Sequence, residues 1–228
     1  MKKSITIILA FFLMMNASFA TVRTVSNFMG GAQYSDIGLA ITASAVGDTL
    51  IVYGSPNAYA FSSCSGWYKN LVVYSSGFNA QKQNAYRANF VGDNCNNVGS
   101  SFRIDPAGSG TRFYGIEFPN GVRFTESSGT MENYTFEHCK FNNLVSLEKV
   151  GQFTVLSSNN IVFSNCIFDY DLGANLGLGN FTTVTTNLLI TNCVFDTYIL
   201  GSTSNGSHTV TVDHCVFLYT DNGTPLFF

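Results

Sequence analysis

Charged residues are scarce in this 228-residue chain: they make up 11% of it, against 46% for hydrophobic residues. Basic residues form no cluster beyond the two lysines near the N-terminus, and the remainder is mildly acidic, which argues against nucleic acid as a partner. The chain also lacks a Gly-x-Ser-x-Gly nucleophile segment and a glycine-rich phosphate loop. This composition suits a β-solenoid, whose surface is supplied mainly by Ser, Thr, Asn and Gly.

The N-terminal segment has the three parts of a secretory signal peptide. Met1-Lys2-Lys3 is basic, Ile5–Met15 is apolar, and Ser18-Phe19-Ala20 has the small-x-small form of a cleavage site. The apolar run is too short for a stop-transfer helix, and no other segment could span a membrane. We therefore expect a signal peptide over 1–20 that is cleaved after Ala20. A single mature domain over 21–228 would then be secreted, periplasmic or at the cell surface.

One eight-residue phrase recurs four times in the second half of the chain. Its form is apolar–x–apolar–x–His/Asn–Cys–x–Phe, and the four cysteines lie 27, 27 and 22 residues apart. The alternation is that of a strand with one buried face, interrupted by a bend before the cysteine. A period of this size marks a solenoid, and the strand character favours an all-β, single-stranded parallel β-helix with one coil per copy. The copies are Tyr134–Phe141, Ile161–Phe168, Leu188–Phe195 and Val210–Phe217.

Stacking of the coils about 4.8 Å apart would bring equivalent residues into columns. A weaker copy, Thr111–Phe118, places Ile116 at the cysteine position. We expect one inward column of cysteines and one of phenylalanines. A third column, at the bend, would carry side chains that bond to the coils above and below. These columns are Cys139, Cys166, Cys193 and Cys215; Phe118, Phe141, Phe168, Phe195 and Phe217; and His138, Asn165, Asn192 and His214.

Six cysteines in an exported chain raise the question of disulfides. The four in the column would have Cβ atoms about 4.8 Å apart, longer than the roughly 3.8 Å of a disulfide. We expect them to be buried thiols that pack as small apolar groups. The other two, Cys64 and Cys95, lie in loop-like sequence, where pairing and free thiols both stay open.

A short helix is expected before the first coil, over Gln33–Gly47, with Ser35 as its N-cap and Gly47 at its end. Its apolar residues Ile37, Ala40 and Ile41 could cover the open end of the core, which a solenoid requires. The first coil strands would then follow at Asp48–Gly54 and Asn70–Tyr74.

These N-terminal features resemble the start of the right-handed parallel β-helix, pectin-lyase-like superfamily. The resemblance is carried by the helix, by Gly47–Val52 and Lys69–Val73, and by the coils Gly110–Phe118 and Asn-Cys-x-Phe. It implies a right-handed coil and a bacterial exported protein, and it covers nearly all of the mature chain. Members include polysaccharide lyases, glycosidases, adhesins and proteins without known activity. Their catalytic signatures do not match here position by position, so no catalytic residue is carried over.

The outward residues three places after the column cysteines suggest a cation site. Asn142, Asp169 and Asp196 would stack at about 4.8 Å, and such oxygen ligands suit calcium. Lys140, expected to pair with Glu117 on the adjacent coil, could then remove a proton from a uronate sugar held by the cation. The alternative is that Asp and Asn simply end a strand and open a turn.

Aromatic residues gather in one loop near the N-terminal end. Tyr59, Trp67 and Tyr68 could stack on sugar rings if exposed, or could pack against the side of the solenoid. His138 and His214 are too far apart, about 14 Å by stacking, to share a zinc ion.

Three classes of function remain open. The first is a non-catalytic exported protein that binds glycan or acts as a cell-surface interaction module, and exposed aromatics along one sheet would favour it. The second is a lyase of uronic-acid polysaccharides, which requires Lys140 beside a cation site. The third is a C-terminally truncated remnant, suggested by the strand-like tail Leu226-Phe227-Phe228.

Overall fold

The structure is a computed structural model of the chain. It describes residues 20–61, 66–75, 86–92, 101–124, 129–142, 145–146, 157–169, 172–176, 185–195, 199–201 and 207–218.

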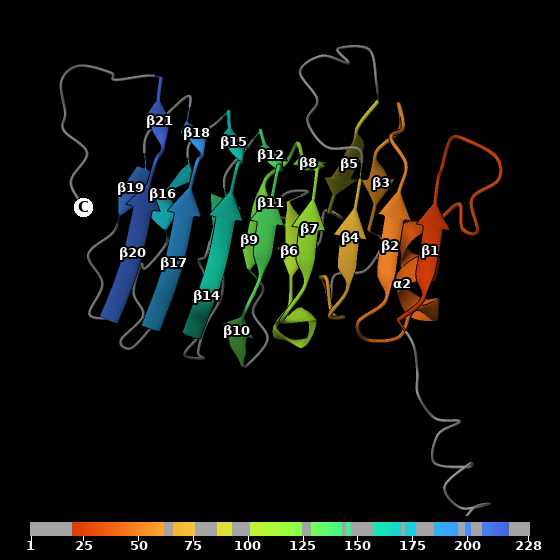
Figure 1. Ribbon diagram of the computed structural model, residues 1–228, viewed down its shortest axis with the longest axis horizontal. Coiled ribbons are helices and arrows are strands. Elements are labelled where there is room, and N and C mark those ends of the chain that lie inside the picture. The colour runs from red at the N-terminus through yellow and green to blue at the C-terminus, as the bar shows by residue number, and fades with distance from the viewer. Residues whose placement is uncertain are drawn as a thin grey trace, which may run out of the picture.

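A long parallel sheet forms one face of the molecule (Figure 1). Its strands follow one another in chain order and come from successive coils; one further strand, β10 (Thr130–Glu132), also pairs with β14. The strands in order are β1 (Val22–Val25), β2 (Thr49–Val52), β4 (Val72–Tyr74), β7 (Arg112–Tyr114), β11 (Thr135–Glu137), β14 (Ser157–Ser164), β17 (Thr185–Thr191) and β20 (Ser207–Asp213).

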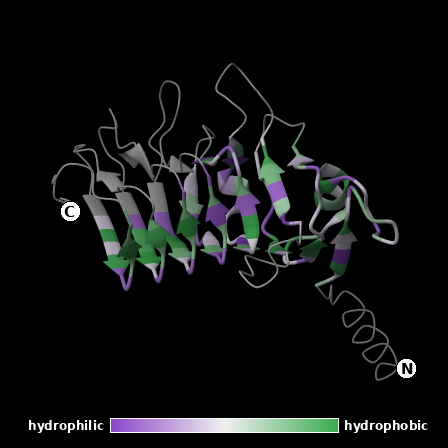
Figure 2. Cartoon of the chain, turned by 90° about the horizontal axis from the view of Figure 1, so that it is seen from above, coloured by the Kyte–Doolittle hydropathy of each residue, from purple (hydrophilic) through white to green (hydrophobic). Residues whose placement is uncertain are grey.

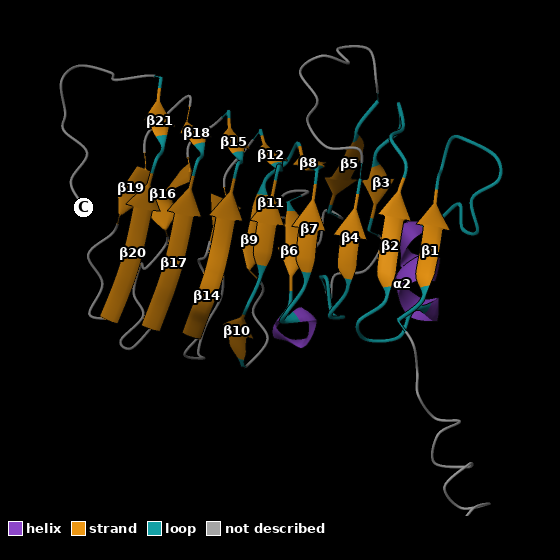
Figure 3. Cartoon of the chain, in the orientation of Figure 1, coloured by secondary structure: helices purple, strands orange, loops and turns teal. Residues whose placement is uncertain are grey.

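Three more parallel sheets complete the wall of the solenoid (Figure 3). The chain passes from the long sheet to the second and then to the third, as in β7, β8 and β9, before it returns to the long sheet. The predicted all-β parallel solenoid is thereby confirmed. The second sheet is β3 (Tyr59–Ala60), β5 (Ala88–Val91), β8 (Ile116–Phe118), β12 (Lys140–Phe141), β15 (Ile167–Phe168), β18 (Val194–Phe195) and β21 (Val216–Phe217). The others are β6 (Phe102–Ile104), β9 (Val122–Phe124) and β13 (Val145–Ser146), and β16 (Leu172–Leu176) with β19 (Ile199–Gly201).

The phenylalanine column lies in the core in the predicted register. Phe141 pairs with Phe118 on one side and with Phe168 on the other, and the series continues to Phe195 and Phe217. The rings are nearly parallel: those of Phe168 and Phe195 have centroids 4.6 Å apart and an interplanar angle of 3°. Ring spacing therefore equals the coil spacing of about 4.8 Å, so each ring packs on the next.

The cysteine column also points inward, as predicted. Cys139, Cys166 and Cys193 are buried, Cys215 is half-buried, and all four are free thiols. The Sγ of Cys166 donates to the Phe136 carbonyl of the preceding coil at 3.4 Å and to the Ser164 carbonyl at 3.3 Å. Burial raises the pKa of the Cys166 thiol well above its usual value. Cys64 and Cys95, for which a disulfide and free thiols both stayed open, lie outside the described residues.

The bend before each cysteine has a left-handed backbone. His138, Asn165, Asn192 and His214 have φ between 50° and 53°, and Gly115 occupies the same place in the weaker copy with φ of 68°. The bends join consecutive coils through the main chain, since the Asn165 N–H donates to the Thr191 carbonyl at 3.0 Å. Hydrophilic residues lie at the bends in Figure 2.

The bend residues were expected to form side-chain hydrogen bonds to the coils above and below, and the bond that the structure shows for Asn165 differs. The Nδ2 of Asn165 donates to Ser164 Oγ at 3.0 Å, within its own coil. A carboxamide ladder occurs instead at the preceding bend, where Asn160 Nδ2 donates to Asn133 Oδ1 at 2.7 Å. Asn133 and Asn160 also have positive φ, and the amide side chain tolerates this conformation.

The N-terminal helix is shorter than predicted. Helix α2 spans Ile37–Ala43 and lies beside β1 at the N-terminal end of the solenoid (Figure 1). Its N-cap is Asp36, whose Oδ1 accepts from the Leu39 N–H at 2.8 Å, and not Ser35 as predicted. An Asp cap both accepts this bond and places negative charge at the helix N-terminus. Ile37, Ala40 and Ile41 are buried, as expected.

Candidate functional site

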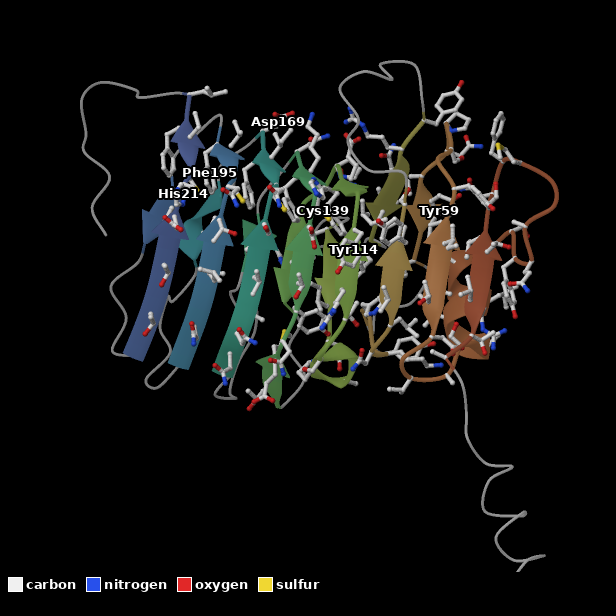
Figure 4. The ribbon with its side chains drawn as sticks, viewed as in Figure 1. Tyr59, Tyr114, Cys139, Asp169, Phe195 and His214 are labelled. Carbon is white, nitrogen blue, oxygen red and sulfur yellow. The ribbon has the colours of Figure 1, made fainter. Side chains whose placement is uncertain are left out.

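Two residues of the predicted cation column, Asn142 and Asp169, follow strands of the second sheet, and each contacts a polar side chain of the preceding coil. The Nζ of Lys140 contacts the carboxylate of Asp169 (labelled in Figure 4). The Nδ2 of Asn142 donates to Glu117 Oε1 at 2.6 Å. The other Glu117 oxygen pairs with the Arg87 guanidinium at 3.1 Å. These five side chains form a polar row that crosses the second sheet from the residue before β5 to the residue after β15.

The structure corrects one ion pair that was expected in this row. Glu117 pairs with Arg87 and Lys140 with Asp169, so the predicted Glu117–Lys140 pair is wrong. Arg87 comes just before β5, and sequence spacing alone did not place that strand next to β8. Lys140, the proton acceptor of the lyase hypothesis, has its Nζ held at a carboxylate.

Calcium binding by Asn142, Asp169 and Asp196 stays a prediction, and Asp196 lies outside the described residues. The structure gives Asp169 a cationic partner in Lys140 and uses the Asn142 amide as a donor. The described ranges contain no group of three or more His, Cys, Asp or Glu side chains that could hold a metal ion.

Two of the three predicted sugar-stacking aromatics are core residues. Tyr59 is 2% exposed and Trp67 is 0% exposed, so neither ring can meet a glycan from solvent. The Tyr59 hydroxyl donates to the Tyr53 carbonyl at 2.6 Å, and burial raises the pKa of Tyr59. Figure 4 labels Tyr59. Packing against the solenoid, the alternative interpretation of this loop, therefore holds for both residues.

The environment of Trp67 explains its burial. Its ring meets Phe61, Phe90 and Phe113 at centroid distances of 5.8, 6.3 and 5.1 Å. Its Nε1 donates to the Lys69 carbonyl at 2.7 Å, which satisfies the indole N–H inside the core. Of the predicted aromatic set only Tyr68 is exposed, and the Lys69 ammonium lies 5.9 Å from its ring centroid.

An aromatic pair that the sequence analysis did not single out lies on the outer face of the long sheet. Tyr74 ends β4 and Tyr114 ends β7, on adjacent coils in direct register. Their ring centroids are 5.1 Å apart with an interplanar angle of 30°, and Tyr74 is 53% exposed. Phe113, one residue before Tyr114, points into the core, so alternation turns Tyr114 outward (Figure 4).

The neighbours of this pair continue the platform along the sheet. Ile51 precedes Tyr74 in the same column, and Glu137 follows Tyr114. In the adjacent outward column Arg112 is exposed and lies between Val72 and Thr135. We define the platform as Tyr74, Tyr114, Arg112 and Glu137. It combines aromatic faces with one cation and one carboxylate.

A sequence signal for the platform exists in part. Tyr114 occupies the outward place two residues before Ile116, the cysteine position of the weaker copy. Tyr74 carries no such marker, because the coils before Thr111 lack the cysteine that fixes the frame. The pairing of Tyr74 with Tyr114 depends on the register between β4 and β7, which only the structure supplies.

The bend histidines are surface residues. The side chains of His138 and His214 are 58% and 77% exposed, and each lies beside the acidic residue that precedes it. The Nδ1 of His214 is 2.8 Å from Asp213 Oδ1. Figure 4 labels His214. The two histidines occupy the same position in their coils, and the coils of Asn165 and Asn192 lie between them.

In the part of the chain that the structure describes, no helix has the length and apolar character to cross a membrane. Comparison of the chain with protein-family models, with curated proteins and with solved structures returns no match.

Proposed function

We propose that this protein is a non-catalytic interaction module that binds glycan on the outer face of its long sheet. The observation that carries the proposal is the stacked pair Tyr74 and Tyr114, of which Tyr74 is exposed and Tyr114 is half-buried. The part of the two rings that their mutual stacking leaves uncovered offers apolar area to the C–H groups of a sugar, and their hydroxyls can hydrogen-bond to it. Arg112 and Glu137 beside them supply a donor and an acceptor for sugar hydroxyl or carboxylate groups.

The repeat of the coils along the sheet supports a chain-like ligand over a small one. Equivalent residues repeat about every 4.8 Å along the solenoid, so a linear polymer could lie across several coils. Ile51, Tyr74, Tyr114 and Glu137 form such a row in direct register. Shared contacts along a row raise affinity through many weak interactions instead of one deep pocket.

Membership of the right-handed, pectin-lyase-like superfamily and export after cleavage at Ala20 belong to this proposal. The parallel coils agree with the former, and the N-terminal pattern of charge and hydropathy supports the latter. An exported rod with a polar surface would place the platform where cell-surface or environmental glycans occur.

Binding to a polysaccharide panel tests the proposal. The full chain, expressed with its own leader, would be run in affinity gels that contain uronic-acid or neutral polysaccharides. We expect retardation by at least one polymer. Tyr74→Ala and Tyr114→Ala should each weaken that retardation at least about tenfold, which corresponds to about 1.4 kcal/mol.

Tyr86→Ala is the matched control, because Tyr86 is 55% exposed and lies outside the platform, before β5. Its binding should equal that of the parent. Retention of full binding by both platform variants would refute the proposed site. Absorbance of an unsaturated sugar product on incubation with uronic-acid polymers would favour the lyase, with Lys140 the first residue to substitute.

A further inference from the structure

A buried carboxylate faces the point at which the predicted signal peptide ends. Asp48 precedes β2, and only 1% of its surface is exposed. Its Oδ1 accepts from the backbone nitrogen of Thr21 at 2.7 Å. Its Oδ2 accepts from the Ala45 N–H at 2.9 Å and lies 3.3 Å from the Arg23 Nε. The carboxylate therefore gathers three donors from the start of β1 and the end of the N-terminal helix region.

Thr21 is held in this position by its own main chain. Its carbonyl accepts from the Thr49 N–H at 2.9 Å, and the next residue, Val22, begins the register with β2. Ala20, the residue before it, is exposed. The nitrogen of Thr21 would thus keep its place at Asp48 if the chain began at Thr21.

We infer that removal of the signal peptide converts the Thr21–Asp48 hydrogen bond into an ion pair between the new amino terminus and Asp48. Hydrolysis of the Ala20–Thr21 peptide bond by a signal peptidase adds the hydroxyl of water to the Ala20 carbonyl carbon and a hydrogen to the Thr21 nitrogen. The amine then takes up a proton at neutral pH. A neutral amide with one N–H becomes an ammonium with three, at 2.7 Å from a buried carboxylate.

The charge balance of the site favours this change. In the uncleaved chain Asp48 has one charged partner, Arg23, whose NH1 also donates to the Tyr34 hydroxyl at 3.1 Å. Removing a carboxylate from water is costly unless charge and hydrogen bonds compensate. The donors of Thr21, Ala45 and Arg23 outweigh the desolvation of Asp48 and lower its pKa. A second cation would complete the compensation.

The inference goes beyond glycan binding and is independent of it. It rests on the predicted cleavage after Ala20 and on the geometry around Asp48. Its consequence is that the processed chain closes its first coil more tightly than the precursor does. Processing would therefore stabilise the solenoid at its N-terminal end after export.

The test compares two N-termini made from full chains. One is the parent with its own leader, and the other carries a glutamine inserted between Ala20 and Thr21, so that the processed chain is one residue longer. Intact mass and N-terminal sequencing of the exported proteins identify the first residue, which we expect to be Thr21 in the parent. Melting temperatures are then measured at pH 6 and pH 9.5.

At pH 6 the parent should melt at least about 3 °C above the glutamine-extended protein, since only the parent places its ammonium at Asp48. Pairing with a carboxylate raises the pKa of an α-amino group above its usual value of about 7.7–8.0. Its stabilisation is therefore complete below that pH and is lost as pH rises through the folded-state value. The difference should shrink at pH 9.5. Arg23, Tyr34 and Asp48 are common to both proteins and cancel in the comparison.

Asp48→Asn, introduced into both chains, should abolish the difference at pH 6. Three results would overturn the inference: a first residue other than Thr21, equal melting temperatures of parent and extended protein at pH 6, or a difference that is the same at pH 9.5. If the Asp48→Asn chains do not fold, the pH comparison decides alone. The two proposals fail separately. An absent difference in melting temperature with intact glycan binding would contradict this inference alone, and absent glycan binding with an intact difference would contradict the proposed function alone.

Discussion

Phenylalanine at the second place after each column cysteine meets nearly the same surroundings in every coil. Phe168 is fully buried, and its ring lies 4.9 Å from that of Phe141 and 4.6 Å from that of Phe195. Parallel stacks of this kind follow from in-register coils, which leave identical side chains directly above one another. A ring in the middle of the column therefore has an aromatic neighbour on both sides.

Phe168→Ala should lower the free energy of unfolding by about 3–5 kcal/mol, because truncation opens a cavity between two rings that the coil spacing holds in place. Chemical denaturation followed by circular dichroism measures the loss. Phe28→Ala is the control. Phe28 is 56% exposed, so its substitution should change stability by about 0.5 kcal/mol or less. A loss below about 1 kcal/mol for Phe168→Ala would contradict the register.

The N-cap of helix α2 shows why a single residue can be hard to predict from the sequence: Ser35 was predicted, and Asp36 is the N-cap. Both residue types are good N-caps, and they are adjacent in the chain. The structure selects Asp36 because the helix begins at Ile37, whose side chain is buried. Tertiary burial of an apolar residue decided between two local signals of similar strength.

At the scale of the element, the bend is the most regular feature of the coil. The residue before the column position has φ between 50° and 68° in five coils, whether it is Gly, His or Asn. A left-handed residue costs an L-amino acid about 1–2 kcal/mol, which Gly avoids and Asn tolerates better than most. The sequence preference for Gly, Asn and His at this place has a conformational cause.

Asn165 tests this cause. Asn165→Ala should be less stable than Asn165→Gly by about 1–2 kcal/mol, because only glycine adopts a φ of 53° without steric cost. Asn187, exposed in strand β17, is the matched control. There the order should reverse, with glycine less stable than alanine by about 0.5–1 kcal/mol. Thermal or denaturant unfolding of the four variants gives both differences. Equal stabilities at Asn165 would show that the left-handed bend is not strained.

The cysteine and phenylalanine columns, the bends and the buried face of the helix could be predicted from the sequence. Each rests on a pattern that repeats at a fixed interval, so an error in one coil would conflict with the others. For Trp67 the sequence left two alternatives open, exposure to a ligand or packing against the solenoid, and could not decide between them. Its sequence context is polar and loop-like, and burial arises from Phe61, Phe90 and Phe113, which come from three different coils.

The polar row and the tyrosine platform were hard to predict for a related reason. Glu117 pairs with Arg87 and not with Lys140, and Tyr74 stacks on Tyr114. Both contacts join the repeating coils to an earlier coil that lacks the repeat. Register between such coils depends on three-dimensional packing, because no sequence marker aligns them.

At the scale of the whole molecule, the core is less well covered at the last described coil than at an internal coil. Tyr134 and Phe136 are fully buried between the coils on either side, whereas the equivalent Val210 and Val212 of β20 are only partly buried. Strand β20 is also the last in the order of the long sheet. In a solenoid each coil contacts mainly its neighbours, so partial burial of these two valines means that their coil has fewer stabilising apolar contacts than the coil of Tyr134 and Phe136.

Amide hydrogen exchange should follow this gradient. Peptides that cover 207–217 should exchange faster than peptides that cover 130–141, because local opening costs less where fewer apolar contacts are broken. Mass spectrometry of digested, partially exchanged protein measures both in one sample. Equal protection of the two segments would show that the last described coil is covered as well as the internal coils.

The buried Trp67 gives the rod an internal spectroscopic label. It is the only tryptophan in the chain, and its partners Phe90, Phe102 and Phe113 belong to the N-terminal half of the solenoid. Tryptophan fluorescence therefore follows the melting of that half alone, whereas far-ultraviolet dichroism sums over every strand. All-or-none unfolding gives both optical signals the same midpoint. A gap between the two midpoints would show that the N-terminal half unfolds separately from the other coils, and a larger gap would mean weaker coupling between coils.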